Sequence, residues 1–260
     1  MDEVTCMGKI NGTKKDRLVV YTALFGAYDD LIDPAEKFVG CDFVCFTDQK
    51  HLKSDVWEVR FVEDCDLSPS MMNRRYKILT HLFFPEYESS LYVDANIAIL
   101  NNPYELKEKY LCDTDFALPK HFARNCLFDE AMVLLRSGRV KPLDVFKQMM
   151  TYKNEGYACQ NSLGENNILF RRHNNLVDVM DAWWQDLQYF SKRDQLSLMF
   201  VLWKFKTNVV LIVESSRCGG YFLLKNHKFS PSPIKFKVYL YFIVFAVPYW
   251  VFKTTYLNRN

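Results

Sequence analysis

The sequence of 260 residues lacks the patterns that identify several common classes of binding protein. Its eight cysteines form no Cys-x-x-Cys pair and have no zinc-like spacing. No basic stripe with interleaved aromatic residues is present and the formal net charge is only +2, so nucleic acid is not an expected partner. The first predicted strand is not followed by the glycine-rich fingerprint that a pyrophosphorylase carries.

The cysteines are scattered among apolar residues of the kind that form a core. This distribution is more typical of reduced thiols than of a disulfide framework, so we expect a cytoplasmic protein. The positions concerned are Cys6, Cys41, Cys45, Cys65, Cys112, Cys126, Cys159 and Cys218.

Hydrophobic runs long enough to cross a bilayer are also missing. The longest, within 236–252, covers about fifteen residues and contains Pro248, whereas a spanning helix needs about twenty. Aromatic residues with lysines at both edges are typical of the membrane interface, so we expect the tail 231–260 to bind the inner face of the cell membrane peripherally. The alternative is a final helix that packs on the core or on a second subunit. The polar segment 1–16 is expected to be neither a signal peptide nor an anchor.

Between these ends, strand and helix patterns alternate without an internal repeat or a linker. Apolar, β-branched runs predict strands at 17–25, 42–48, 56–62, 90–99, 114–118 and 167–171. Helices are predicted at 68–84, 127–137, 142–152, 176–190 and 195–204. The sequence therefore predicts one α/β domain over residues 17–230.

The most informative segment is the predicted strand 90–99. Its only carboxylate and carboxamide side chains are Asp94 and Asn96, which would project to the same side of an extended chain. Open α/β sheets bind their ligands at such strand ends, and two hard oxygen ligands suit a divalent cation with positions left for phosphate oxygens. The alternative is a buried strand that ends in an ordinary turn.

Other polar residues are placed where they would surround that strand end. Arg74, Arg75 and Lys77 lie on the preceding helix, where they would meet a diphosphate or form a solvated face. Asp194 stands at a helix start, either as a cap or as a general base. Three tryptophans either stack on sugar rings or belong to the core, and they are Trp183, Trp184 and Trp203.

Five motifs in this order resemble a known family. They are YTALFGAYD (21–29), CFTD (45–48), RRYKI (74–78), YVDAN (92–96) and RDQLS (193–197). Together they resemble a glycosyltransferase-like group called domain of unknown function 616, which occurs in bacterial polysaccharide loci and in plants. The resemblance covers about residues 17–230. It implies a GT-A-type fold, in which a Rossmann-like sheet flanked by helices binds a nucleotide and a second half binds the acceptor.

The resemblance also implies roles for individual residues. Donor binding would involve Thr22, Ala23, Phe25, Gly26, Asp48, Arg75, Lys77 and Asp94. The residue pattern itself, polar segments next to short apolar strands, leads us to expect acceptor or sugar binding of His121, Arg124, Glu165 and Asn166. A Mn²⁺ or Mg²⁺ ion would be held by Asp94, Asn96 and His227, although Asn96 replaces the second carboxylate of an Asp-x-Asp motif. Catalysis would involve Asp194 and Gln195.

The resemblance implies transfer of a sugar from a nucleotide-diphosphate donor. The fold type suggests UDP as the nucleotide, and a galactose-type sugar is the first candidate for transfer. The acceptor would be lipid-linked or a polysaccharide in the synthesis of bacterial O-antigen or capsule. Inversion is preferred over retention, because a carboxylate is available as base, although the Asp194-Gln195 pair also resembles retaining transferases. The alternatives are a nucleotidyltransferase, a sugar-nucleotide hydrolase and a catalytically silent scaffold at the membrane.

Overall fold

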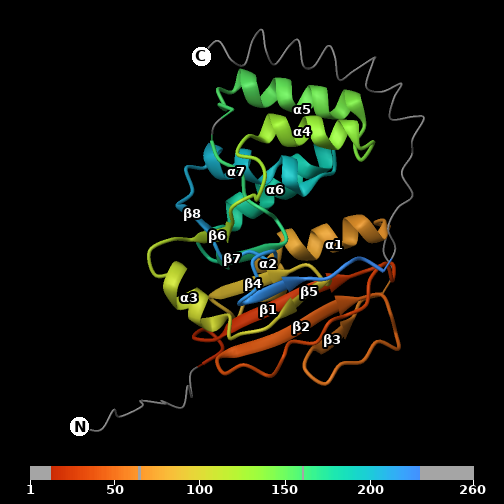
Figure 1. The fold of residues 1–260 in the computed structure, drawn as a ribbon, viewed down its shortest axis with the longest axis vertical. Helices are drawn as coiled ribbons and strands as arrows, with labels where there is room; N and C mark the ends of the chain where they lie inside the picture. The colour runs from red at the N-terminus through yellow and green to blue at the C-terminus, as the bar shows by residue number, and fades with distance from the viewer. Residues whose placement is uncertain (1–12, 64–65, 160, 229–260) are drawn as a thin grey trace.

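The computed structural model describes residues 13–63, 66–159 and 161–228, and a seven-stranded mixed sheet forms its centre (Figure 1). The strands, in spatial order, are β3 (Glu58–Phe61), β2 (Cys41–Thr47), β1 (Leu18–Leu24), β4 (Ser89–Val93), β7 (Ile168–Arg172), β6 (Phe116–Pro119) and β8 (Val209–Ile212). The four strands from β3 to β4 are parallel. β7 is antiparallel to both of its neighbours, and β8 is again parallel to β6.

Both faces of this sheet are covered. In β1, Val19 and Tyr21 belong to one cluster of buried side chains, whereas Leu18 and Val20 belong to the other. Successive residues of a strand point to opposite faces, so an uninterrupted apolar strand requires a partner layer on each side. The prediction of a Rossmann-like mixed sheet flanked by helices is therefore confirmed.

Helices supply most of these layers. The buried cluster on one face includes side chains of α1 (Pro69–Ile78), α2 (Thr80–Phe83), α4 (Leu127–Arg136), α5 (Pro142–Asn154), α6 (Val177–Tyr189) and α7 (Leu198–Lys204). The other face is covered by α3 (Tyr104–Tyr110) and a small sheet of β5 (Ile97–Ile99) and β9 (Phe222–Leu224). Figure 1 shows α4 and α5 at one end of the molecule and β2 and β3 at the other.

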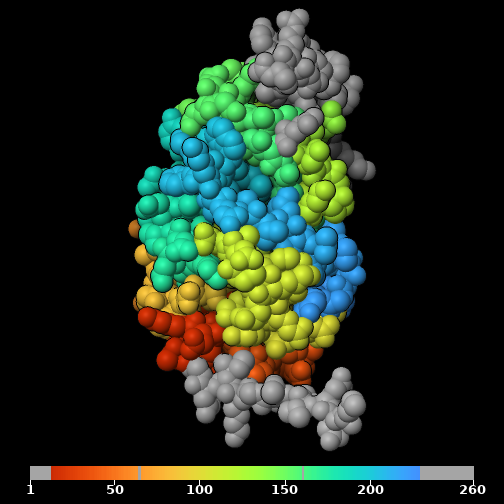
Figure 2. All heavy atoms as spheres, turned by 90° about the vertical axis from the view of Figure 1, so that its left-hand side faces the viewer, coloured from red at the N-terminus to blue at the C-terminus, as the bar shows by residue number. Residues whose placement is uncertain are grey.

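The chain returns to its first half near the end of the described region. In Figure 2 the yellow segment around α3 lies against the blue segment that follows β8. Two side-chain contacts join them: Lys109 Nζ lies 2.8 Å from Glu214 Oε1, and the Tyr221 hydroxyl donates to Glu105 at 2.6 Å. β9 then pairs with β5, which directs the last described residues toward the end of β4.

The predicted strand 90–99 is wrong at its centre. β4 ends at Val93, and residues 94–96 form a turn closed by a hydrogen bond from the Ile97 amide to the Asp94 carbonyl, 3.0 Å. The extended-chain argument for pairing Asp94 with Asn96 therefore does not hold. The predicted helix 68–84 divides at Leu79 into α1 and α2, and α3, β8 and β9 were not predicted.

None of the helices in residues 13–63, 66–159 and 161–228 is long and apolar enough to cross a membrane. The tail 231–260, for which membrane binding is predicted, lies outside the described residues.

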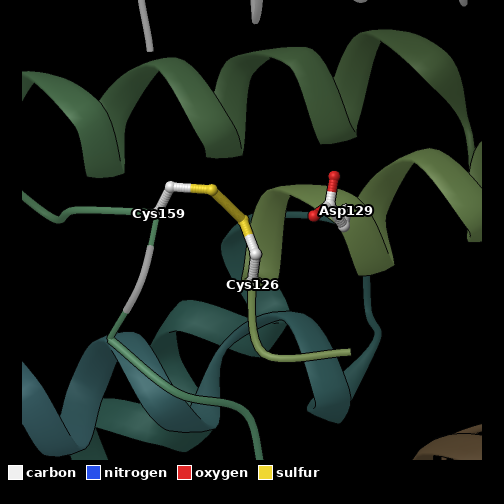
Figure 3. Close-up of side chains that lie close together, drawn as sticks. All are labelled: Cys126, Asp129 and Cys159. Carbon is white, nitrogen blue, oxygen red and sulfur yellow. A yellow bond between two sulfur atoms is a disulfide. The ribbon is translucent and has the colours of Figure 1, made fainter. Parts of the chain in front are cut away.

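The prediction of reduced thiols is wrong for one pair of cysteines. Cys126, immediately before α4, and Cys159, after α5, form a disulfide across a sequence separation of 33 (Figure 3). The sequence could not reveal this pair, because spacing alone does not show which cysteines the fold brings together. Cys41, Cys45, Cys112 and Cys218 are free.

Removing this cross-link should destabilise the fold. A disulfide that closes a loop of this length contributes about 3–4 kcal/mol by the chain-entropy estimate, and for a chain of this size that corresponds to a Tm lower by roughly 8–15 °C. Differential scanning calorimetry of the Cys126→Ser, Cys159→Ser double variant measures the loss. Reductant should lower the wild-type Tm by a similar amount and leave the variant unchanged. An equal response of both proteins to reductant would show that the two cysteines are not joined.

Candidate functional site

A cavity of about 840 Å³ opens where β1 and β4 end. Its wall combines the turn after β1, one side of α1, the 94–96 turn, the loop after β6, the segment before β7 and the 3-10 turn Asp194–Leu196. Most of the predicted site residues contribute to its wall: Phe25, Gly26, Lys77, Asp94, Asn96, His121, Arg124, Glu165, Asn166, Asp194, Gln195 and His227.

A single ammonium group joins the two halves of this wall. Lys77 Nζ lies 2.7 Å from Asp194 Oδ2 and 3.5 Å from Asp94 Oδ1, and only 7% of the Lys77 side chain is exposed. Arg74 adds a second cation, with Nε 3.8 Å from Asp194 Oδ1. Asp94 and Asp194, which are far apart in the sequence, therefore both pair with cationic side chains of α1.

These ion pairs set the protonation of their members. Burial alone would raise the pKa of Asp194, but the charges of Lys77 and Arg74 outweigh it and hold that pKa well below its usual range. Burial opposes the charge on Lys77 in turn, and Asp194 and Asp94 overcome it, so the pKa of Lys77 is raised. The pairs thus favour the charged forms of Asp194 and Lys77. For Asp94 burial outweighs the charge of Lys77, so the pKa of that carboxyl is raised.

The helix register corrects one predicted donor contact. Ser70, Arg74 and Lys77 share the side of α1 that faces the cavity, as spacings of three and four residues require. Arg75 is one position away on the helix and does not line the cavity. Arg74 occupies the predicted place instead, and its guanidinium donates to the Ser70 carbonyl at 2.7 Å.

The β1 end also differs from the prediction. Thr22 and Ala23 are fully buried inside the strand and do not reach the cavity, whereas Phe25 and Gly26 do. Asp48 does not line the cavity either. Its carboxylate accepts a hydrogen bond from the Gly26 amide, at 2.9 and 3.1 Å to the two oxygens. Asp48 thereby fixes the turn after β1, and this turn lines the cavity. Gly26 has φ +80°, and a Cβ there would lie 2.8 Å from Pro69, so only glycine fits this turn.

The 94–96 turn faces the last described segment of the chain. The Asp94 carboxylate accepts the Tyr92 hydroxyl at 2.9 Å, and 37% of the Asp94 side chain is exposed to the cavity. The Asn96 side-chain nitrogen Nδ2 donates to the main-chain carbonyl of Lys225 at 3.0 Å. The main-chain amide of Lys225 donates back to the main-chain carbonyl of Asn96 at 2.9 Å. This pairing brings His227 to the same cavity as Asp94 and Asn96.

His227 is held by a carboxylate that the sequence prediction gave no role. Its Nδ1 lies 2.8 Å from Asp29 Oδ2, and Asp29 Oδ1 accepts the Lys228 amide at 3.0 Å. The Asp29 side chain is only 3% exposed. Imidazole ligands of metals commonly bond a carboxylate through the second ring nitrogen, so this pair is suited to present Nε2 to a cation.

Only one group of three close His, Cys, Asp or Glu side chains occurs within the described residues, and it does not suit a metal. It consists of Cys126, Asp129 and Cys159. Figure 3 shows that the two sulfurs are bonded to each other, so neither is available as a thiolate ligand.

The loop after β6 forms another part of the wall. His121 Nδ1 accepts the amides of Ala123 and Arg124 at 3.2 and 3.1 Å, which organises the loop. Burial and the charge of Arg124 lower the pKa of His121, so the ring is neutral at pH 7. Arg124 Nε donates to Glu130 of α4 at 2.5 Å. Phe122 is exposed, and the Arg217 guanidinium makes a cation–π contact with its ring at 4.0 Å from the centroid.

The segment before β7 presents buried polar atoms without protein partners. These are Glu165 Oε2, both side-chain atoms of the Asn166 amide, and Asn167 Oδ1. Asn166 is only 4% exposed and Glu165 6%. The Gln195 side chain donates to the Gly164 carbonyl at 2.5 Å and accepts the Asn166 amide at 3.3 Å, so Gln195 positions this segment. A buried polar group without a partner is costly, which indicates that a ligand or water completes these bonds.

The tryptophans do not serve as sugar platforms in this cavity. Trp183 is fully buried, Trp184 packs against the same core, and Trp203 packs edge-on against Tyr157 with centroids 5.4 Å apart. None of the three lines the cavity. All three lie in segments predicted as helices, where aromatic residues more often belong to the core, so the core alternative is the correct one.

Several residues of the cavity wall were not predicted, namely Tyr28, Asn73, Tyr92, Phe122, Glu130, Arg139, Arg193 and Arg217. Arg193 belongs to the RDQLS motif, and Tyr28 and Tyr92 belong to two others, so the motifs contained a signal for these three. Arg139 and Arg217 lie outside all five motifs, in connecting segments whose position depends on the whole fold.

With this geometry established, similarity to known proteins can be assessed. A family model described as "TOD1/MUCI70, glycosyltransferase-like domain" matches residues 9–218. The chain belongs to this family. Membership confirms the predicted glycosyltransferase-like class of enzyme, while the domain of unknown function 616 and the bacterial loci are not part of the match.

Two curated relatives come from Arabidopsis thaliana. The chain is 27% identical over 224 residues to "Probable hexosyltransferase MUCI70", which covers 74% of this chain and 38% of that protein. It is 28% identical over 225 residues to "Alkaline ceramidase TOD1", which covers 72% of this chain and 48% of that protein. The chain thus spans less than half the length of either relative.

Two solved structures have low similarity to the fold. The apo structure of the bifunctional glycosyltransferase WbbM gives a TM-score of 0.44 at 13% identity, covering 90% of this chain and 44% of that chain. Apo mouse xyloside xylosyltransferase 1 gives 0.43 at 8% identity, covering 76% and 85%. Similarities of this size carry no argument about the site.

The Asp194 ion pairs predict a pH-dependent contribution to stability. Because the folded-state pKa of Asp194 is depressed, its contribution is complete above the unfolded value of about 3.9 and is lost as the pH falls further. The free energy of unfolding of Asp194→Asn should therefore be well below that of the wild type at pH 6, with the difference shrinking toward pH 3. Urea titrations at both pH values measure it.

Asp55→Asn is the matched control, because Asp55 is exposed and makes no ion pair within the described residues. Its difference from the wild type should be small at both pH values. A constant deficit of Asp194→Asn across the pH range would contradict the depressed pKa.

Proposed function

We propose that this protein transfers a sugar from a nucleotide-diphosphate donor to a hydroxyl group of a glycan acceptor. The observation that carries this proposal is the unpartnered polar wall at Glu165, Asn166 and Asn167, in the same cavity as Lys77 and Arg74. Sugar hydroxyls both donate and accept hydrogen bonds, as the free Asn166 amide does. The cations suit a diphosphate. A nucleotide sugar combines both chemistries in one molecule.

The basic side of α1 would stabilise the leaving group. As the bond between the sugar and the diphosphate breaks, negative charge develops on the nucleotide diphosphate. Lys77 and Arg74 are already oriented by Asp194, so no reorganisation is required when that charge appears. In this proposal the donor is UDP-linked, with a galactose-type sugar as the first candidate.

The residues at the 94–96 turn fit a divalent cation. Asp94 offers a carboxylate oxygen, Asn96 an amide oxygen whose nitrogen is already bonded, and His227 an imidazole nitrogen oriented by Asp29. Oxygen ligands with one imidazole and open positions suit Mn²⁺ or Mg²⁺. Such an ion, when bound, would supply positive charge to the phosphate oxygens of the donor.

The acceptor hydroxyl needs a group that receives its proton. Asp194 was predicted for this role, but its pairs with Lys77 and Arg74 stabilise the ionised form and oppose proton uptake. Glu165 has a buried oxygen without a partner, while its other oxygen is held by Arg217 Nε at 3.1 Å. We assign the proton to Glu165 Oε2 as the acceptor oxygen bonds to the anomeric carbon and the nucleotide diphosphate departs. This assignment fits inversion.

The acceptor in this proposal is lipid-linked or a polysaccharide. Hexosyl transfer agrees with the printed name of one relative and not with the ceramidase name of the other. The bacterial surface-glycan setting and the membrane-binding tail rest on the sequence alone, since both relatives are plant proteins. The cytoplasmic location was argued from reduced thiols, and that argument does not hold for Cys126 and Cys159.

A panel of UDP-, GDP- and CMP-sugars tests the central proposal. The full chain with Mn²⁺ should be stabilised by one donor class in a thermal-shift measurement and should release the matching nucleotide when acceptor is present. Asp94→Asn should reduce nucleotide release by about 100-fold or more, the cost of losing one electrostatic contact to a developing charge.

Asp55→Asn should behave as wild type in the same assays. The proposal fails if no donor stabilises the protein or if Asp94→Asn retains full activity. Release of nucleotide at an equal rate without acceptor would identify a sugar-nucleotide hydrolase instead.

Asp29→Asn should weaken Mn²⁺ binding by about 10–100-fold, because an amide orients the His227 ring less well than a carboxylate does. Titration of the protein with Mn²⁺, followed by electron paramagnetic resonance of the free ion, measures this without any substrate. Asp30→Asn is the control, since Asp30 is exposed and, within the described residues, forms its ion pair with Lys228 alone. Equal Mn²⁺ affinity in all three proteins would remove His227 from the metal site.

A further inference from the structure

The charges that line the cavity do not balance. Six arginine and lysine side chains face four aspartate and glutamate side chains, and each of the four acids lies within ion-pair distance of at least one of four cations. The remaining two cations are Arg139 and Arg193, and neither makes an ion pair with any residue that the structure describes.

These two arginines are held next to each other. Arg193 immediately precedes the 3-10 turn, and Arg139 lies in the connection between α4 and α5. Arg193 Nε and Nη2 both donate to the Arg139 main-chain carbonyl at 3.3 Å. Arg193 is therefore anchored through one edge of its guanidinium, and among the described residues neither its Nη1 nor the Arg139 guanidinium has a protein acceptor.

Their environment favours a bound anion. The pKa of Arg193 is lowered by burial and by the neighbouring charges of Arg74 and Arg139, which together outweigh the opposing charges of Asp194 and Glu130. Like charges gathered in a partly buried wall repel each other, and an anion between them removes that cost. Guanidinium groups present paired N–H donors that match the two oxygens of a carboxylate or phosphate.

Arg139 comes from a different element than the cations assigned to the donor, and Arg193 lies next to Asp194 in the chain. Lys77 and Arg74 stand on α1 beside the Asp94 turn, whereas Arg139 belongs to the α4–α5 connection, in the helical half of the molecule. Glu130 of α4 also acts on the charge of Arg193. Glu130 also holds Arg124, which with His121 belongs to the wall on which the acceptor is expected.

We propose that Arg139 and Arg193 form an anion subsite for the acceptor. The acceptor would then be an acidic glycan that carries a carboxylate or a phosphate close to the hydroxyl that is glycosylated. This inference rests on the proposed function for the identity of the acceptor. Two sources of the anion share this chemistry: the carboxylate of a uronic acid in a polysaccharide and the phosphate of a glycosyl phosphate in a lipid-linked acceptor.

Binding of probes without donor tests the subsite by isothermal titration calorimetry. The probes are a uronic-acid oligosaccharide, the same oligosaccharide with its carboxylates reduced to alcohols, and a glycosyl phosphate. Wild-type protein should bind one charged probe at least about 10-fold more tightly than the neutral one. Arg139→Gln and Arg193→Gln should each remove most of this preference and leave affinity for the neutral probe unchanged. The identity of the preferred probe distinguishes the two sources.

Lys141→Gln is the matched control, because Lys141 is exposed, lies two residues from Arg139 and does not line the cavity. It should retain the full preference for the charged probe. An equal Tm of the arginine variants and the wild type confirms that they fold. Equal binding of charged and neutral probes by the wild type would overturn the inference.

A thermal-shift measurement with UDP separates the remaining outcomes. If Arg139→Gln and Arg193→Gln lose stabilisation by UDP instead of charged-probe binding, the pair serves the donor diphosphate and the inference is wrong. A second outcome is that the charged-probe preference is present and depends on both arginines, but no nucleotide sugar binds or reacts. The anion subsite is then supported, and the proposal of sugar transfer is wrong.

Discussion

The ammonium group of Lys77 is the interaction on which the rest of the cavity depends. It joins Asp94, at the end of a parallel strand, to Asp194, which precedes the last helix of the other half. Without this cation Asp94 would lose its ion-pair partner among the described residues, and Asp194 would keep only Arg74, whose Nε lies 3.8 Å away. The Lys77 side chain therefore fixes the Asp94 turn relative to the 3-10 turn that begins at Asp194.

A second buried cation supports the helix that carries Lys77. Arg171 of β7 is 1% exposed and has no carboxylate partner within the described residues. Its guanidinium donates to the Ile78 carbonyl at 3.3 Å and to the Tyr21 hydroxyl, which in turn donates to the Lys77 carbonyl at 2.9 Å. The carbonyls at the end of α1 thus find donors from two central strands, as the negative end of a helix requires.

Local patterns predicted the central strands because these are apolar on both faces, and they predicted the start of α1 because Ser68 and Pro69 form a cap. Local patterns failed where tertiary contacts decide. The Asp94 turn is set by Ile97 and by pairing with Lys225, and Arg74 replaces Arg75 because of the helix register. Arg139 and Arg217 lie in connections that carry no pattern of their own. Motif resemblance found much of the cavity but could not show which residues of a motif face it.

The disulfide between Cys126 and Cys159 makes a covalent ring that encloses α4, α5 and the turn that carries Arg139. That turn is exposed at Ser137, Gly138 and Arg139, where a protease finds accessible backbone. A single cut there would open the ring without releasing either piece, since the sulfur bridge still joins the two chains. The nicked protein would migrate as one species until reductant is added, so backbone integrity and covalent continuity are separate properties in this part of the molecule.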